Sequence, residues 1–121
     1  FSVEERIEIT RSAIEMRGLD TSRIEIDSFD GLLVNYCQRK NATVILRGLR
    51  AVADFEYELQ MANMNRHLND EIVTTFIMAN DAYFYVSSNL CKEVCRLGGD
   101  ISKLVPPPVD ARLLAKLKPG K

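Results

Sequence analysis

The sequence predicts an α/β fold in which a parallel sheet is flanked by helices. Helical and strand patterns alternate along the chain, in the order helix, strand, helix, strand, helix, strand, helix, followed by a helical tail. The clearest strand is Thr43–Leu46, because it is β-branched and apolar with no polar alternation, as expected for a strand covered on both faces. A second buried strand is expected at Ile72–Met78. Alternation of this kind predicts parallel strands joined by right-handed crossovers.

The N-terminal part of the chain predicts two helices and a short strand. Ser2 begins a capping box, and Gly18 ends the helix that follows it. Alternating apolar and charged residues predict a short edge strand over residues 23–27. Asp30 is expected to cap a second helix over residues 31–39.

The C-terminal part predicts three further helices. A long helix is expected over residues 54–68, and a shorter one runs from the capping residues 87–89 to Arg96. The three prolines at 106–108 are expected to exclude regular structure, so that Asp110 caps the last helix.

Composition excludes several classes of protein. The chain has 121 residues, of which 46% are hydrophobic and 27% charged, and this suits one soluble domain over residues 1–121. A net charge of -1 argues against a general nucleic-acid binder. No apolar run is long enough to cross a membrane, and no signal-peptide pattern is present. The odd cysteine count indicates a reducing, cytoplasmic setting, with Cys91 and Cys95 as buried apolar side chains rather than metal ligands.

Basic residues follow the strand Thr43–Leu46, at the point where it is expected to end. Arg47 and Arg50 flank Gly48 and Leu49. Guanidinium groups bind phosphate oxygens in a bidentate manner, and glycine lets the backbone approach a ligand. Ligands of open α/β sheets lie off the carboxyl ends of the strands. This turn therefore predicts a phosphate site, although paired arginines are also common on solvated surfaces.

A second stretch, Tyr83–Asn89, lies between a strand and a helix start. The unpaired N–H groups and the helix dipole at such a position favour an anion. Ser87, Ser88 and Asn89 add hydroxyl and amide partners, although such residues also serve only as helix caps. Successive parallel strands would place both stretches on one edge of the sheet, which would form a pocket for a nucleotide or a polyphosphate.

Three polar residues of the long helix are also candidates. Glu58 follows Arg50 by about two turns, so it is expected either to accept from a ribose hydroxyl or to pair with an arginine. Asn65 lies on the same side of the helix. His67 is far from both strand ends, and we interpret it as a structural or surface residue.

Several motifs are shared with one known family. They are the run Arg47–Gln60, the segments Met64–Leu68 and Tyr85–Ser88, the pair Lys92 and Glu93, the opening Phe1–Arg6 and the helix start Gly31–Val34. These motifs resemble the bacterial phosphopantetheine adenylyltransferases over essentially the whole chain. The resemblance implies a Rossmann-like nucleotidyltransferase fold, a homohexamer and the penultimate step of coenzyme A synthesis.

The resemblance also implies a reaction between ATP and 4'-phosphopantetheine. The 4'-phosphate attacks the α-phosphate of ATP, and the products are dephospho-coenzyme A and pyrophosphate. Mg²⁺ would accompany the nucleotide rather than occupy a metal site of the protein. Coenzyme A shares the pantetheine arm and is a candidate feedback inhibitor.

Roles for individual residues follow from the resemblance in the same way. Arg47 would hold the phosphate of phosphopantetheine, while Leu33 and Asn65 would line its arm. The residues implied in ATP binding are Gly48, Leu49, Arg50, Glu58, Tyr83, Phe84, Tyr85, Val86, Ser87, Ser88 and Asn89. The family usually has a third serine or another residue where this chain has Asn89, and we expect that change to be tolerated.

One part of the family pattern is not found in the chain. The family's first strand, its Thr-x-Gly-His loop and a lysine that joins Arg47 are expected upstream of Phe1, so an N-terminal βαβ portion is absent from these 121 residues. The loop's histidine stabilises transition-state charge in the family, and His67 does not replace it. We therefore assign no catalytic residue in this chain and expect the 121 residues alone to be inactive. Two alternatives are a non-catalytic module that binds adenine nucleotide or coenzyme A, and a related nucleotidyltransferase with another phosphorylated acceptor.

Overall fold

The computed structural model describes residues 1–117, which form two compact units. Unit 1 consists of Phe1–Ser28 and the segment that begins at Val86, and unit 2 is Phe29–Tyr85. The prediction of one domain over residues 1–121 stays a prediction. In the described part of the chain, no helix has both the length and the apolar character needed to cross a bilayer.

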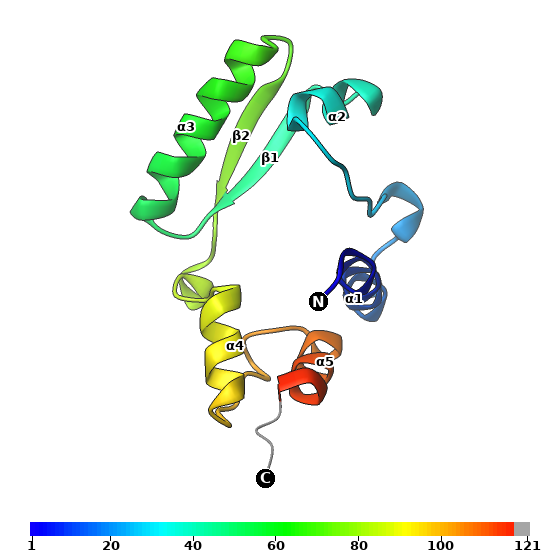
Figure 1. Cartoon of the computed structure of the whole chain (residues 1–121), viewed down its shortest axis with the longest axis vertical. Coiled ribbons are helices and arrows are strands. Elements are labelled where there is room, and N and C mark those ends of the chain that lie inside the picture. Colours follow the sequence, from blue (N-terminus) through cyan, green and yellow to red (C-terminus); the bar gives the residue numbers. More distant parts are fainter. Residues whose placement is uncertain (118–121) are drawn as a thin grey trace. The chain divides into compact units, whose positions relative to one another are not determined.

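Helices and strands alternate over residues 33–78, and only helices flank this stretch in the described part of the chain (Figure 1). The elements are α1 (Val3–Met16), the 3-10 helix η1 (Thr21–Arg23), α2 (Leu33–Arg39), β1 (Val44–Leu49), α3 (Val52–Leu68), β2 (Val73–Met78), the 3-10 helix η2 (Asp81–Tyr83), α4 (Ser88–Arg96) and α5 (Pro107–Leu117).

Unit 2 is built on a β-α-β arrangement. Strands β1 and β2 pair in parallel, in a register that begins at Val44 and Val73, and α3 connects them along one face (Figure 1). Phe55 of α3 meets Phe76 of β2 edge-to-face, with ring centroids 6.2 Å apart, a geometry that aromatic pairs favour. The predicted α/β class with parallel strands is therefore confirmed.

A small core fixes α2 against the beginning of this sheet. Val34 and Cys37 of α2 pack with Ile45 of β1 and with Ile72, and all four side chains are buried. Leu33 packs against the same cluster. Burial of these apolar side chains holds Leu33 close to the strands, where it lines the pocket described below.

Within unit 2 the sheet is covered on one face only, so the prediction of strands buried on both faces is wrong for the described part of the chain. Ile45 and Leu49 are 8% and 4% exposed, whereas Val44 and Leu46 are 58% and 61% exposed. Successive side chains of a strand point to opposite faces. The helices α2 and α3 pack on the face of Ile45, and the opposite face has no cover in unit 2. Strand β2 shows the same pattern, since Ile77 is exposed.

Two strand predictions need correction. Strand β1 continues through Arg47 and Gly48 to Leu49, because β2 offers ladder partners for all three residues. Residues 23–27 do not form the predicted strand. The carboxylate of Asp20 accepts from the Ser22 N–H at 2.9 Å and caps η1 there, so local side-chain hydrogen bonds take the place of a ladder.

Two helix starts also differ from the prediction. Helix α2 begins at Leu33 without a side-chain cap, so Asp30 is not its cap. Gly31 has a φ of 87°, a left-handed conformation that cannot belong to a right-handed helix. Helix α5 begins at Pro107, so the prolines do not exclude regular structure. Proline is tolerated in a first turn because the N–H groups there lack intrahelical partners.

Unit 1 begins with the predicted capping box. The Glu5 N–H donates to Ser2 Oγ at 3.1 Å, and the Ser2 N–H donates to Glu5 Oε2 at 2.6 Å. Gly18, with a φ of 64°, follows the end of α1 as predicted. Lys116 of α5 also donates to Glu5, at 2.8 Å, so that α1 and α5 lie side by side.

The core of unit 1 joins α4 to α5. Cys95 and Ile101 are each 1% exposed and Leu113 is 5% exposed, and the three side chains form one cluster. Cys91 is also buried, and both cysteines of α4 are free thiols. The prediction that Cys91 and Cys95 are buried apolar side chains is confirmed.

Candidate functional site

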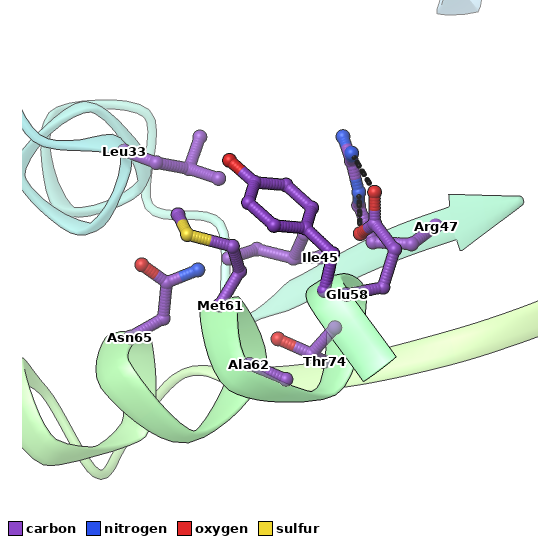
Figure 2. A pocket seen from close by; sticks show the side chains of 9 residues that line it. Leu33, Ile45, Arg47, Glu58, Met61, Ala62, Asn65 and Thr74 are labelled. Carbon is purple, nitrogen blue, oxygen red and sulfur yellow. Dashed lines mark hydrogen bonds and ion pairs between the residues drawn. The ribbon is translucent and has the colours of Figure 1, made fainter. Parts of the chain in front are cut away.

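A pocket of about 120 Å³ lies in unit 2 between α2, α3 and the two strands (Figure 2). Its lining residues are Leu33, Ile45, Arg47, Tyr57, Glu58, Met61, Ala62, Asn65 and Thr74. The pocket is smaller than the roughly 300–1,000 Å³ typical of sites for drug-sized ligands. It therefore suits an extended, slender group better than a bulky ring system.

Helical spacing places one wall of the pocket. Tyr57, Met61 and Asn65 follow one another at intervals of one turn of α3, so they share a face of the helix. Leu33 of α2 lies across from them (Figure 2). Asn65 is 8% exposed although it is polar, so its amide is available to a group inside the pocket rather than to bulk water.

Arg47 and Glu58 form a bidentate ion pair at this pocket (Figure 2). Arg47 Nε donates to Glu58 Oε2 at 2.6 Å, and Nη2 donates to Oε1 at 2.5 Å. The hydrogen bonds from Arg47 hold the pKa of Glu58 below its ordinary value, and the same bonds raise the pKa of Arg47. The Arg47 side chain is still 47% exposed, while that of Glu58 is 12% exposed.

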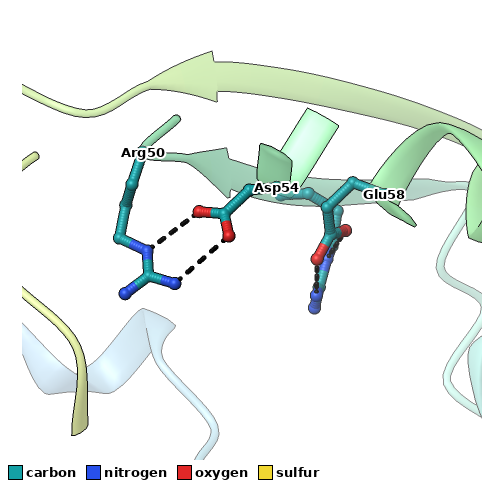
Figure 3. A network of polar contacts seen from close by, with 4 residues as sticks. Arg50, Asp54 and Glu58 are labelled. Atoms are coloured by element: carbon teal, nitrogen blue, oxygen red, sulfur yellow. Dashed lines mark hydrogen bonds and ion pairs between the residues drawn. The ribbon is translucent and has the colours of Figure 1, made fainter. Parts of the chain in front are cut away.

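A second ion pair joins Arg50 to Asp54, which lies one turn of α3 before Glu58 (Figure 3). Arg50 Nε donates to Asp54 Oδ2 at 3.0 Å, and Nη2 donates to Oδ1 at 3.3 Å. Hydrogen bonds from Arg50 lower the pKa of Asp54. Asp54 also lies in the first turn of α3, where a negative charge is stabilised by the helix dipole.

The two ion pairs decide what this part of the site can bind. Of the two roles left open for Glu58, the structure shows the pairing with an arginine. The pair occupies Nε and one terminal nitrogen of Arg47, so the other terminal nitrogen lies outside the fork. A half-exposed guanidinium beside a pocket can bind a phosphate if it shares its donors with Glu58 or releases that carboxylate.

Gly48 and Leu49 lie within strand β1 rather than in the predicted turn. The Leu49 side chain is buried, and its carbonyl accepts from the Ala79 N–H at 2.7 Å. An added Cβ at Gly48 would meet no atom within 4 Å, so a ligand has room to approach the backbone there. Their predicted roles in ATP binding stay predictions.

The second predicted stretch spans the boundary between the units. Tyr83, Phe84 and Tyr85 belong to unit 2 and are exposed, whereas the residues from Val86 onward belong to unit 1. The prediction that this stretch shares one edge with Arg47 therefore stays a prediction.

Within unit 1, the predicted cap of α4 is confirmed. Ser87 is the N-cap, and its hydroxyl accepts from the Leu90 N–H at 3.2 Å. Ser88 and Asn89 are the first two residues of α4 and are exposed. Their role in ATP binding, like that of Val86 and Ser87, stays a prediction.

Five lining residues were not among the site residues predicted from sequence, namely Ile45, Tyr57, Met61, Ala62 and Thr74. Tyr57 and Met61 share a helix face with Asn65, so helical periodicity counted from Asn65 would have found both. Thr74 had no such signal, because it reaches the pocket through its register opposite Ile45. His67 is exposed near the end of α3, which confirms its interpretation as a surface residue.

We expect the Arg47–Glu58 pair to make stability depend on acid pH. Since the pKa of folded Glu58 lies below its ordinary value of 4.5, the pair's contribution is present above that value and is lost as the pH falls through the lowered pKa. The difference in free energy of unfolding between wild type and Glu58→Gln should therefore shrink between pH 6 and about pH 3. Urea unfolding across this range measures it, and a constant difference would contradict the ion pair.

The chain matches a known protein family. The sequence profile described as cytidylyltransferase-like matches residues 1–94. The matched segment contains all of unit 2, and with it every residue that lines the pocket.

Proposed function

This chain belongs to the cytidylyltransferase-like family, and we propose that it acts in the transfer of the adenylyl group of ATP to 4'-phosphopantetheine. Family membership supports nucleotidyl transfer in general, and the parallel α/β unit agrees with it. The acceptor is argued from the pocket and from the motifs shared with the phosphopantetheine adenylyltransferases.

The observation that carries the proposal is Arg47 on the wall of a narrow pocket. Its guanidinium is half exposed, so an incoming phosphate can reach it. Arginine binds phosphate through paired N–H donors of fixed geometry. An acceptor with a terminal phosphate would therefore place that group on Arg47 and leave the rest of the molecule to fill the pocket.

The remainder of the pocket suits the arm of phosphopantetheine. Leu33 and Met61 present apolar surface, and the buried Asn65 presents an amide. A pantetheine arm is slender and alternates methylene groups with amides, so it needs both kinds of contact. ATP would then bind beside Arg50, and the roles of Tyr83–Asn89 in ATP binding rest on the resemblance alone.

The chemistry requires little from acid or base groups of this chain. A phosphate oxygen of the acceptor attacks the α-phosphorus of ATP, the bond between the α-phosphorus and the bridging oxygen breaks, and pyrophosphate leaves with that bond's electrons. Arg47 would orient the nucleophile and Arg50 would offset negative charge, so catalysis depends on positioning and electrostatics. No residue of this chain is assigned as catalytic.

Magnesium would arrive with the nucleotide. The carboxylates nearest the arginines, Asp54 and Glu58, each accept two hydrogen bonds from a guanidinium, so they do not suit a dedicated metal site. Mg²⁺ is usually bound through substrate phosphates and water when the protein supplies few ligands. A homohexamer, a cytoplasmic location and feedback by coenzyme A complete the proposal and rest on the resemblance.

Pyrophosphate release tests the proposed function. We expect the full-length protein to release pyrophosphate only when both ATP and 4'-phosphopantetheine are present. Other phosphorylated acceptors, supplied in competition, test the choice of acceptor. Binding of ATP without turnover by the complete protein would contradict adenylyl transfer and favour a non-catalytic module.

A further inference from the structure

Thr74 carries a buried hydroxyl without a hydrogen-bond partner among the described residues. Its Oγ1 atom is shielded from solvent, yet the residue lines the same pocket as Arg47 and Asn65 (Figure 2). Buried polar atoms are nearly always hydrogen-bonded, because an unsatisfied donor or acceptor carries its full cost of desolvation. A group that enters this pocket could supply the missing partner once the Thr74 side chain rotates about χ1 to expose Oγ1 to it.

The surroundings of Thr74 indicate the chemistry of that group. Thr74 lies on β2 opposite Ile45, and Asn65 lies on α3, so two polar residues line the pocket from different elements, and Thr74 also lines a second cavity of about 270 Å³. A threonine hydroxyl both donates and accepts, and so does a side-chain amide. A secondary amide has one N–H donor and one carbonyl acceptor, which match two such partners.

We propose that Thr74 is a substrate-binding residue whose hydroxyl, together with Asn65, recognises an amide in the slender arm of the acceptor. This inference rests on the proposed function, since Arg47 would hold the phosphate of the same molecule. Recognition by a buried hydroxyl selects for an amide-bearing arm over a purely aliphatic one, because an aliphatic arm would leave both polar side chains unpaired.

One variant, Thr74→Val, should raise the Tm of the free protein and lower its affinity for the acceptor. Thr74→Val keeps the side-chain shape and removes the hydroxyl. The free protein should become more stable, with a higher Tm, because the unsatisfied group is gone. The affinity for 4'-phosphopantetheine should fall by roughly tenfold, the effect of losing one hydrogen bond. A purely structural role for Thr74 would not move Tm and affinity in opposite directions.

Calorimetric titration on the protein of the complete reading frame tests this, with 4'-phosphopantetheine and inorganic phosphate as separate probes. We expect Thr74→Val to weaken binding of phosphopantetheine only, and Thr74→Ser to retain it. Thr75→Val is the matched control, because Thr75 is the next residue of β2 and is exposed. The pair Thr74→Ser and Thr74→Ala repeats the comparison if the valine variant does not fold.

The outcomes separate this inference from the proposed function. Equal affinity of wild type and Thr74→Val for phosphopantetheine overturns the role of Thr74 and leaves the acceptor assignment intact. A wild-type protein that does not bind phosphopantetheine at all overturns both. Weaker binding of phosphopantetheine and phosphate alike would also contradict the inference, since it would show a general disturbance of the site.

Discussion

Arg47→Ala is expected to lower the affinity for 4'-phosphopantetheine by about 100-fold or more, because charge-assisted hydrogen bonds are worth ~1.5–3 kcal/mol each and the guanidinium can offer two. Affinity for pantetheine, which lacks the phosphate, should change little. The affinity of Arg47→Lys for 4'-phosphopantetheine should lie between those of wild type and Arg47→Ala, because lysine keeps the charge and loses the forked pair of donors. Titration of each variant with both ligands measures the contribution of the phosphate.

Two further variants test whether the loss of affinity in Arg47→Ala has another cause, either an unpaired Glu58 carboxylate or a change in net charge. Truncation of Arg47 leaves the carboxylate of Glu58 without its partner, so Arg47→Ala is compared with the same change in a Glu58→Gln background. Arg66→Ala removes an exposed arginine of α3 that does not line the pocket, and its binding should match wild type. If Arg66→Ala loses as much affinity as Arg47→Ala, net charge explains the effect and a specific phosphate contact does not.

Ile101→Ala is expected to destabilise the protein by about 2–5 kcal/mol, since it removes a fully buried side chain and leaves a cavity. Ile101 is 1% exposed and packs with Cys95 and Leu113, which come from α4 and α5. A loss of this size lowers Tm by on the order of 10 °C in a chain of this length. Thermal and urea unfolding of the variant measure the change.

Leu97→Ala is the matched control for the core variant. Leu97 directly follows α4 and is 81% exposed, so its truncation should change the free energy of unfolding by no more than about 0.5 kcal/mol. Equal destabilisation by both variants would contradict the core assigned to unit 1.

Periodicity predicted the elements better than their limits. Helix α3 and strand β2 were both expected, because their apolar spacing is local and visible in the sequence. The end of β1 was predicted too early, since Arg47 and Gly48 join the ladder only because β2 offers partners from a distant segment. The sequence also could not show which faces of the strands are covered, because the apolar character of Leu46 does not reveal whether another element packs on it.

Some residues of the pocket could be predicted from the sequence and others could not. Arg47, Leu33 and Asn65 were expected in one pocket from the resemblance, and they line one pocket. The pairing of Arg50 with Asp54 has the i, i+4 spacing of common ion pairs, so it could have been predicted from sequence. Thr74 could not have been predicted as a pocket residue, because its position in the pocket depends on the strand register opposite Ile45. Its proposed role depends on the burial of its Oγ1 atom.

A crystal structure of the complete protein with 4'-phosphopantetheine bound tests the central claim most directly. The claim predicts a phosphate oxygen within hydrogen-bond distance of the Arg47 guanidinium, with the arm running past Met61 and Asn65. A phosphate bound at the basic end of α2, beside Arg39 and Lys40, with the pocket at Arg47 empty, would contradict it.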